Sequence, residues 1–116
     1  MLAVTQYSPA YIDQVRARFA AAKGADFNLL LLALDHHFMH RVRNREGKDG
    51  NPINEVRMLS DSLMEHDGVL TANTTIKYKP EHSVLGIAVG DTIAIDEDGF
   101  RRLTAAFLDE IATRYA

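Results

Sequence analysis

Residues 26–44, DFNLLLLALDHHFMHRVRN, begin apolar and end basic, and the predicted fold is built around them. Nearly every side chain from Phe27 to Leu34 is apolar, so a helix here would be apolar on all its faces and would need burial on most sides. From Asp35 onward the same stretch carries histidines and arginines. The sequence therefore predicts a central helix over residues 27–44, which leads from the core to a polar, basic end where we expect the functional residues.

A first helix is predicted over residues 9–23. Ser8 followed by Pro9 is typical of a helix N-terminus, because the serine oxygen can accept a free backbone N–H and proline has none to lose. Apolar residues then recur at helical spacing, and Gly24 stands where a helix C-terminus favours glycine. The connection to the central helix is short, with Asp26 as the next N-cap, so these two helices should lie antiparallel.

A third helix is predicted over residues 52–66. The segment before it, REGKDGNP, is rich in turn residues, and Asn51 and Pro52 repeat the kind of start seen in the first helix. Gly68 then ends the helical spacing. The third helix would pair with the central one across this loop, so the first three helices would form two helical hairpins that share the central helix.

The sequence after Gly68 changes to short runs that are rich in β-branched residues. Two of these runs flank Gly90 and Asp91, which are typical of a two-residue hairpin turn. We therefore predict a small antiparallel β-sheet. Its strands are predicted over residues 69–72, 74–79, 84–89 and 92–95.

A last helix is predicted over residues 97–114. Asp96 is expected to cap it, and Glu97 and Asp98 in its first turn suit the positive end of a helix. Its apolar residues recur at helical spacing and form one buried face. The predicted fold class is therefore α+β: a single domain with a three-helix core, a small antiparallel sheet and a C-terminal helix.

The composition excludes several classes of protein. The chain of 116 residues has no cysteine, which excludes disulfides, zinc–thiolate sites, iron–sulfur clusters and cysteine nucleophiles. The N-terminus lacks the pattern of a secretion signal, and the apolar run of the central helix is too short to cross a bilayer, so we expect a cytoplasmic protein that does not enter the membrane. The 13 Lys and Arg residues against 16 Asp and Glu residues give a formal net charge of −3, so nucleic acid is not expected as a partner.

The histidines at the end of the central helix are one candidate site. His36 and His40 are four residues apart, so on a helix both imidazoles would project from one face, as zinc ligands do. A third ligand would have to come from elsewhere in the chain: Asp61, Glu65, His66 or His82. The pattern is not that of the zinc proteases, because His37 stands where they have glutamate. In the alternative interpretation His37 packs at the edge of the core and the other two lie on a polar or interfacial face, so no residue is assigned to a metal and the cofactor stays unknown.

A basic cluster follows the histidines. Five cations and three carboxylates lie between residues 41 and 57: Arg41, Arg43, Arg45, Lys48 and Arg57, with Glu46, Asp49 and Glu55. Helix C-termini favour cations and helix N-termini bind anions, so the junction of the central and third helices would suit a small anion. The spacing of a Walker phosphate loop is absent. In the alternative interpretation, the arginines pair with the three carboxylates and hold the loop.

These patterns predict a small, non-enzymatic cytoplasmic module that binds a partner or a small anion. The predicted ligand-binding residues are His36, His40, Arg41, Arg45, Lys48 and Arg57. A homodimer is expected, because the apolar central helix would keep one face for a second copy, with Met39, Met58 and Met64 as adaptable contacts. The alternative is a small metal-dependent or acid–base enzyme that uses His36 and His40.

Overall fold

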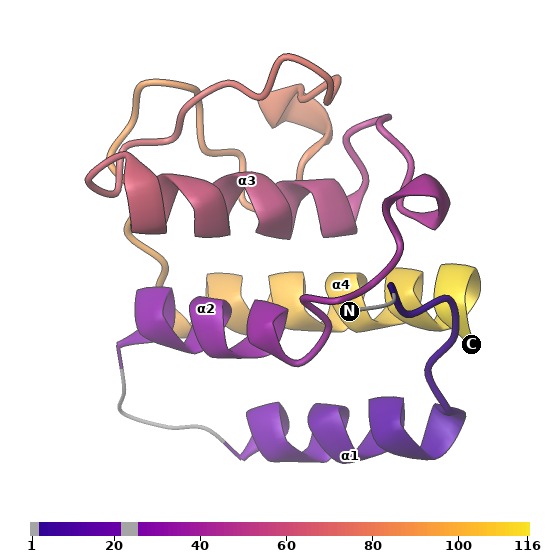
Figure 1. The fold of residues 1–116 in the computed structure, drawn as a ribbon. Coiled ribbons are helices and arrows are strands. Elements are labelled where there is room, and N and C mark those ends of the chain that lie inside the picture. The colour runs from indigo at the N-terminus through magenta and orange to yellow at the C-terminus, as the bar shows by residue number, and fades with distance from the viewer. Residues whose placement is uncertain (1–2, 22–25) are drawn as a thin grey trace.

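The computed structural model describes residues 3–21 and 26–116, and Figure 1 shows how this part of the chain is arranged. Its α-helices are α1 (Pro9–Ala20), α2 (Phe27–His36), α3 (Pro52–Glu65) and α4 (Glu97–Tyr115), and two 3-10 turns, η1 (Arg43–Arg45) and η2 (Pro80–His82), lie between them. In Figure 1, α1, α2 and α3 follow one another from bottom to top, α4 runs behind α2, and the chain between α3 and α4 loops over α3. None of these helices combines the length and the apolar character needed to cross a membrane.

α4, the last helix, is the one around which the others pack, because it contacts α1, α2 and α3. Its buried apolar side chains are Phe100, Leu103, Phe107, Leu108, Ile111 and Tyr115. This arrangement corrects the prediction that residues 27–44 form the central helix. The reason is length, since α4 has 19 residues and α2 has only 10. On the outer face of α2, Leu29 is 62 % exposed, so the apolar run is not buried on all sides.

α2 ends at His36, before the predicted end of the helix. The next turn uses hydrogen bonds to carbonyls three residues back, and it buries the Phe38 ring completely. The chain then pairs with the N-terminal segment: Val4 donates its N–H to the carbonyl of His40 (2.7 Å), and Val42 donates to the carbonyl of Val4 (2.6 Å). These bonds replace those of a longer helix, so the two histidines of the predicted site do not share one.

The predicted antiparallel sheet does not form in the described residues, so the α+β fold class is wrong and this part of the chain is mainly α-helical. The four predicted strands contribute one isolated antiparallel bridge, between Val69 and Thr92. Their apolar side chains still serve the core, because Leu70, Ile76 and Ile93 are buried in it. These runs therefore contribute buried side chains to the core, whereas the predicted strand pairing is wrong.

Side chains of α2 and α3 form some of the hydrogen bonds to the backbone of the predicted strands. The two carboxylate oxygens of Glu55 on α3 accept the backbone N–H groups of Val84 (2.8 Å) and Leu85 (2.9 Å). Asn28 on α2 pairs with two backbone groups of the last predicted strand, at 3.0 Å each. Buried backbone groups need partners, and in this segment some come from helix side chains and others from the short backbone pairing around Leu70 and Asp91.

The predicted helix starts are confirmed. Side-chain oxygens of Ser8, Asp26, Asn51 and Asp96 accept backbone N–H groups in the first turns of α1, α2, α3 and α4. These residues satisfy N–H groups that have no partner within the helix. Gly24, the predicted C-terminal residue of the first helix, lies outside the described residues.

Replacing Glu55 by glutamine should destabilise the fold. Glu55 is only 2 % exposed, and the new amide NH₂ would face a backbone N–H where an acceptor is needed. A buried donor left without an acceptor costs about 1–3 kcal/mol, and urea unfolding measures this loss. Glu65→Gln, at an exposed position on the same helix, is the matched control and should leave the unfolding free energy nearly unchanged. Equal losses in the two variants would show that Glu55 does not anchor this segment.

Candidate functional site

A buried ionic cluster joins the end of the α2 region to α3. The Glu46 carboxylate lies 3.1 Å from Nε of Arg41 and 2.7 Å from Nη2 of Arg57. Asn54 donates to its other oxygen at 2.9 Å, and Arg41 also pairs with Asp35 at 3.2 Å. The side chains of Arg41 and Glu46 are 1 % and 2 % exposed. The cluster therefore pairs these charges within the fold, and among the described residues only Nη2 of Arg41 is a buried nitrogen of the cluster without a hydrogen-bond partner.

The pKa of Glu46 reflects these partners. Burial alone would raise it, because an ionised carboxylate loses its hydration, but the hydrogen bond from Arg57 and the positive charge of Arg41 outweigh burial and lower it below its ordinary value. Glu46 is thus ionised and matched by two guanidinium groups. The prediction that Arg41 and Arg57 bind a ligand is not tested by this geometry, but both already have a partner, as in the alternative interpretation of the basic cluster.

Two asparagines shape the loop that follows the cluster. Asn51 donates to the carbonyl of Glu46 at 2.8 Å, and Asn54 accepts the N–H of Gly50 at 3.0 Å. Gly50 has a φ of +86°, and a Cβ there would lie 2.5 Å from the carbonyl oxygen of Lys77, so only glycine fits. The loop is thereby held against a segment that is distant in sequence.

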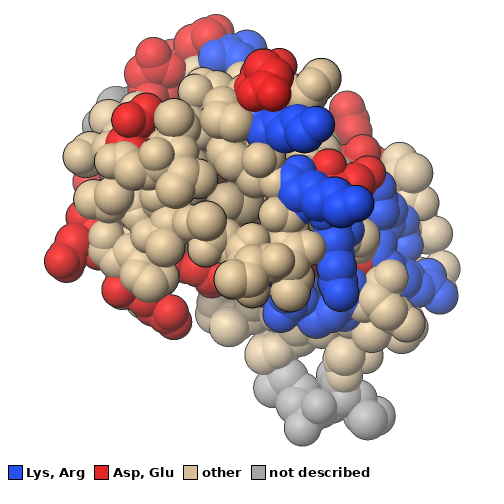
Figure 2. Space-filling model, turned by 90° about the horizontal axis from the view of Figure 1, so that it is seen from above, with Lys and Arg blue, Asp and Glu red and all other residues tan. Residues whose placement is uncertain are grey.

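This contact brings basic residues together. Lys77 donates its N–H to the carbonyl of Lys48 at 2.8 Å. We use the name basic edge for the exposed cations of the two segments, Arg43, Arg45, Lys48, Lys77 and Lys79. None of the five forms an ion pair with a carboxylate of residues 3–21 or 26–116. Figure 2 shows Lys and Arg side chains gathered along one side of the molecule, whereas most Asp and Glu side chains of that face lie elsewhere.

A polar pocket of about 260 Å³ opens between these two segments. It is lined by Asp49, Gly50, Lys77, Lys79 and His82. The hydrogen bond from the Asn51 amide lowers the pKa of Asp49, so one carboxylate of the lining stays charged. Two ammonium groups and an imidazole face this single carboxylate, which leaves an excess of positive charge in the pocket.

The predicted histidine pair is exposed and divided between two segments. His36 is the last residue of α2, and His40 lies in the turn beyond it. His37 packs as the alternative interpretation expects: its Nδ1 donates to the carbonyl of Ala33 at 2.7 Å, and its ring lies edge-on to Phe19 at 5.4 Å. In the described ranges, no three His, Asp or Glu side chains are grouped as metal ligands would be.

Sequence reasoning found part of the basic edge and missed the rest. Arg45 and Lys48 are among the predicted ligand-binding residues, whereas Arg43, Lys77 and Lys79 are not, nor is His82 of the pocket. The available signal was the pair of lysines around Tyr78, which is also typical of the edge of a sheet. No family model, curated protein or solved structure matches this chain.

The ionic cluster should make stability fall in acid. Because the pKa of Glu46 is lower in the folded state than its ordinary 4.5, its contribution is present above about pH 4.5 and is lost as the pH falls through the folded value. Glu46→Gln leaves two guanidinium groups without their carboxylate and should cost about 3–5 kcal/mol at pH 7. Urea unfolding at pH 7 and pH 3 should show that the difference between the two proteins shrinks in acid. A difference that stays constant would contradict the lowered pKa.

Proposed function

We propose that this chain is a non-enzymatic cytoplasmic binding module that takes a small, phosphate-like anion at the basic edge. The observation that supports the proposal is that, within residues 3–21 and 26–116, the five cations there form no ion pair, whereas Arg16, Arg57, Arg102 and Arg114 are all paired with carboxylates. Arg45 and Lys48 keep their predicted role. Lys77 and Lys79 join them.

In this proposal the buried cluster supports the site without contacting the ligand. Glu46 and its two arginines hold the start of the loop, and Asn54 holds its end, so Lys48 stays beside Lys77. Exposed ion pairs contribute little when a flexible side chain must be ordered. A loop that is already in place lowers that cost, and the lysines of the pocket can then donate charge-assisted hydrogen bonds to a phosphate oxygen.

Inorganic phosphate should raise the melting temperature of the protein, and the double variant Lys77→Ala/Lys79→Ala should lose this effect. At about ten times the dissociation constant, a bound ligand stabilises by about 1.4 kcal/mol, which raises the melting temperature of a domain this size by about 5 °C. Differential scanning fluorimetry at constant ionic strength measures the shift, which added sodium chloride should weaken.

The matched control for this experiment is Arg16→Ala/Arg102→Ala. It also removes two positive charges, but both arginines are paired with aspartates at 3.0 Å and 2.9 Å. This variant should keep the full phosphate effect. If both double variants respond to phosphate as the native protein does, the anion does not bind at the basic edge.

A homodimer is the second candidate, favoured by large apolar side chains exposed on neighbouring helices. Leu29 near the start of α2 is 62 % exposed, and Met64 near the end of α3 is 71 % exposed. The two helices pack against each other, and Figure 1 shows that these two helix ends lie on the same side. Met39 is also exposed, whereas Met58, which we had expected at the interface, is buried in the core. A second copy would cover this apolar surface.

Leu29→Glu should weaken such a dimer. Sedimentation velocity over a range of concentrations should show a native dimer that dissociates on dilution and a variant that is monomeric throughout. Val89→Glu is the control, because Val89 is similarly exposed at 50 % but lies in the segment between α3 and α4. A native protein that stays monomeric at high concentration would exclude the dimer.

A further inference from the structure

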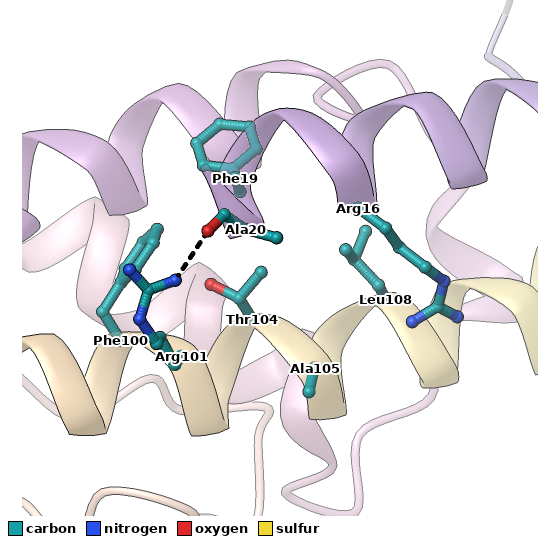
Figure 3. Close-up of a pocket in the computed structure, with 8 residues that line it drawn as sticks. All are labelled: Arg16, Phe19, Ala20, Phe100, Arg101, Thr104, Ala105 and Leu108. Atoms are coloured by element: carbon teal, nitrogen blue, oxygen red, sulfur yellow. Dashed lines mark hydrogen bonds between the residues drawn. The ribbon is translucent and has the colours of Figure 1, made fainter. Parts of the chain in front are cut away.

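A second cavity lies between α1 and α4, at the end of the fold opposite the loops that cover α3 (Figure 1). It is partly open to solvent and has a volume of about 260 Å³, and its apolar lining includes Phe19 from α1 and Phe100 and Leu108 from α4. The two phenylalanine rings are tilted relative to each other, with centroids 6.1 Å apart. Figure 3 shows the side chains of the two helices facing each other across this space. The cavity shares no lining residue with the basic edge.

Thr104 places an unpaired hydroxyl in this apolar lining. The residue is 8 % exposed, and its Oγ1 is buried and has no hydrogen-bond partner among the described residues. Threonine on a helix usually bonds to a carbonyl of the preceding turn, as Thr113 does to Asp109 at 2.9 Å on the same helix. A buried polar group without a partner costs free energy, so a ligand that supplied the partner would recover it.

Two guanidinium groups border the cavity, and their charges are matched by carboxylates. Arg16 lies 3.0 Å from Asp109, and Arg101 lies 3.8 Å from Glu97 and donates to the Ala20 carbonyl at 3.1 Å. An anionic ligand would have to displace these carboxylates. A neutral ring would leave the pairs intact and could stack on the flat guanidinium faces.

We propose that this cavity binds a small neutral aromatic molecule with one hydrogen-bonding group, of the size of a phenol. The ring would pack against Phe19 and Phe100, and its polar group would bond to the Thr104 hydroxyl. Size supports this class of ligand, because an apolar cavity of about 150 Å³ is enough to hold benzene. The preference for aromatic over aliphatic ligands follows from the two phenylalanine rings, which favour offset or edge-on contacts with a third.

Binding of phenol and of toluene tests the proposal, since the two rings are similar in size and only phenol carries a hydroxyl. Chemical-shift titration of the native protein should show saturable shifts at Phe19 and Phe100, with phenol binding about tenfold more tightly than toluene. Thr104→Val keeps the shape of the side chain and removes the hydroxyl, so it should lower phenol affinity to that of toluene. The affinity for toluene should not change.

Thr113→Val is the matched control, since it removes a hydroxyl from α4 away from the cavity, and it should bind both probes as the native protein does. Ala105→Phe is the second variant: it places a ring in the cavity lining at an exposed position, so it should abolish both interactions even if Thr104→Val fails to fold. The proposal is overturned by an absence of saturable shifts in the native protein. It is equally overturned by phenol binding that survives Thr104→Val or Ala105→Phe unchanged.

Discussion

The carboxylate of Glu46 is the constraint on which the basic end of this molecule depends. An isolated charge in a protein interior loses several kcal/mol of hydration, so a buried Glu46 requires cations that reach it. Arg41 and Arg57 do so from opposite ends of the loop, and their two contacts close it. Once closed, the loop carries Lys48 on its outer side and meets Lys77 through the backbone. The pairing of the buried Arg41 and Glu46 with the partly buried Arg57 thus positions the exposed cations of the basic edge.

Pairing, rather than the number of charges, separates the structural cations from the candidate functional ones. In the sequence Arg41, Arg45 and Arg57 look alike, and the local excess of positive charge is small. In the fold Arg41 is 4 % exposed and lies over the Phe107 ring at 5.8 Å, whereas Arg45 is exposed. Glu46 pairs with Arg41 and Arg57 and leaves Arg45 unpaired with it, and only the three-dimensional structure identifies which arginines form these pairs. A count of charges along the chain contains no such information.

Local signals predicted the helix starts, and long-range contacts account for the errors. A cap such as Asn51 acts on N–H groups two or three residues away, so its effect is visible in sequence. The conformation of residues 69–95 depends instead on hydrogen bonds to Glu55 and Asn28, which belong to helices formed by earlier parts of the chain. Likewise, α2 ends at His36, and the chain beyond it pairs through His40 and Val42 with Val4 of the N-terminal segment. These partners are distant in sequence from the groups that they bond, so local sequence patterns do not predict them.

The structural use of these polar side chains affects how a loss of function in this protein should be interpreted. Enzymes often use buried Glu, Arg and Asn side chains in catalysis. Here Glu46, Glu55 and Asn54 instead form hydrogen bonds with the backbone or with one another. A substitution at any of them would disturb binding indirectly, by releasing a loop, and would lower stability at the same time. Substitution of Lys77 acts on an exposed side chain without an internal ion pair among the described residues, so its effect on binding should come without a comparable loss of stability. That difference separates residues that contact a ligand from residues that hold the surface on which the ligand is bound.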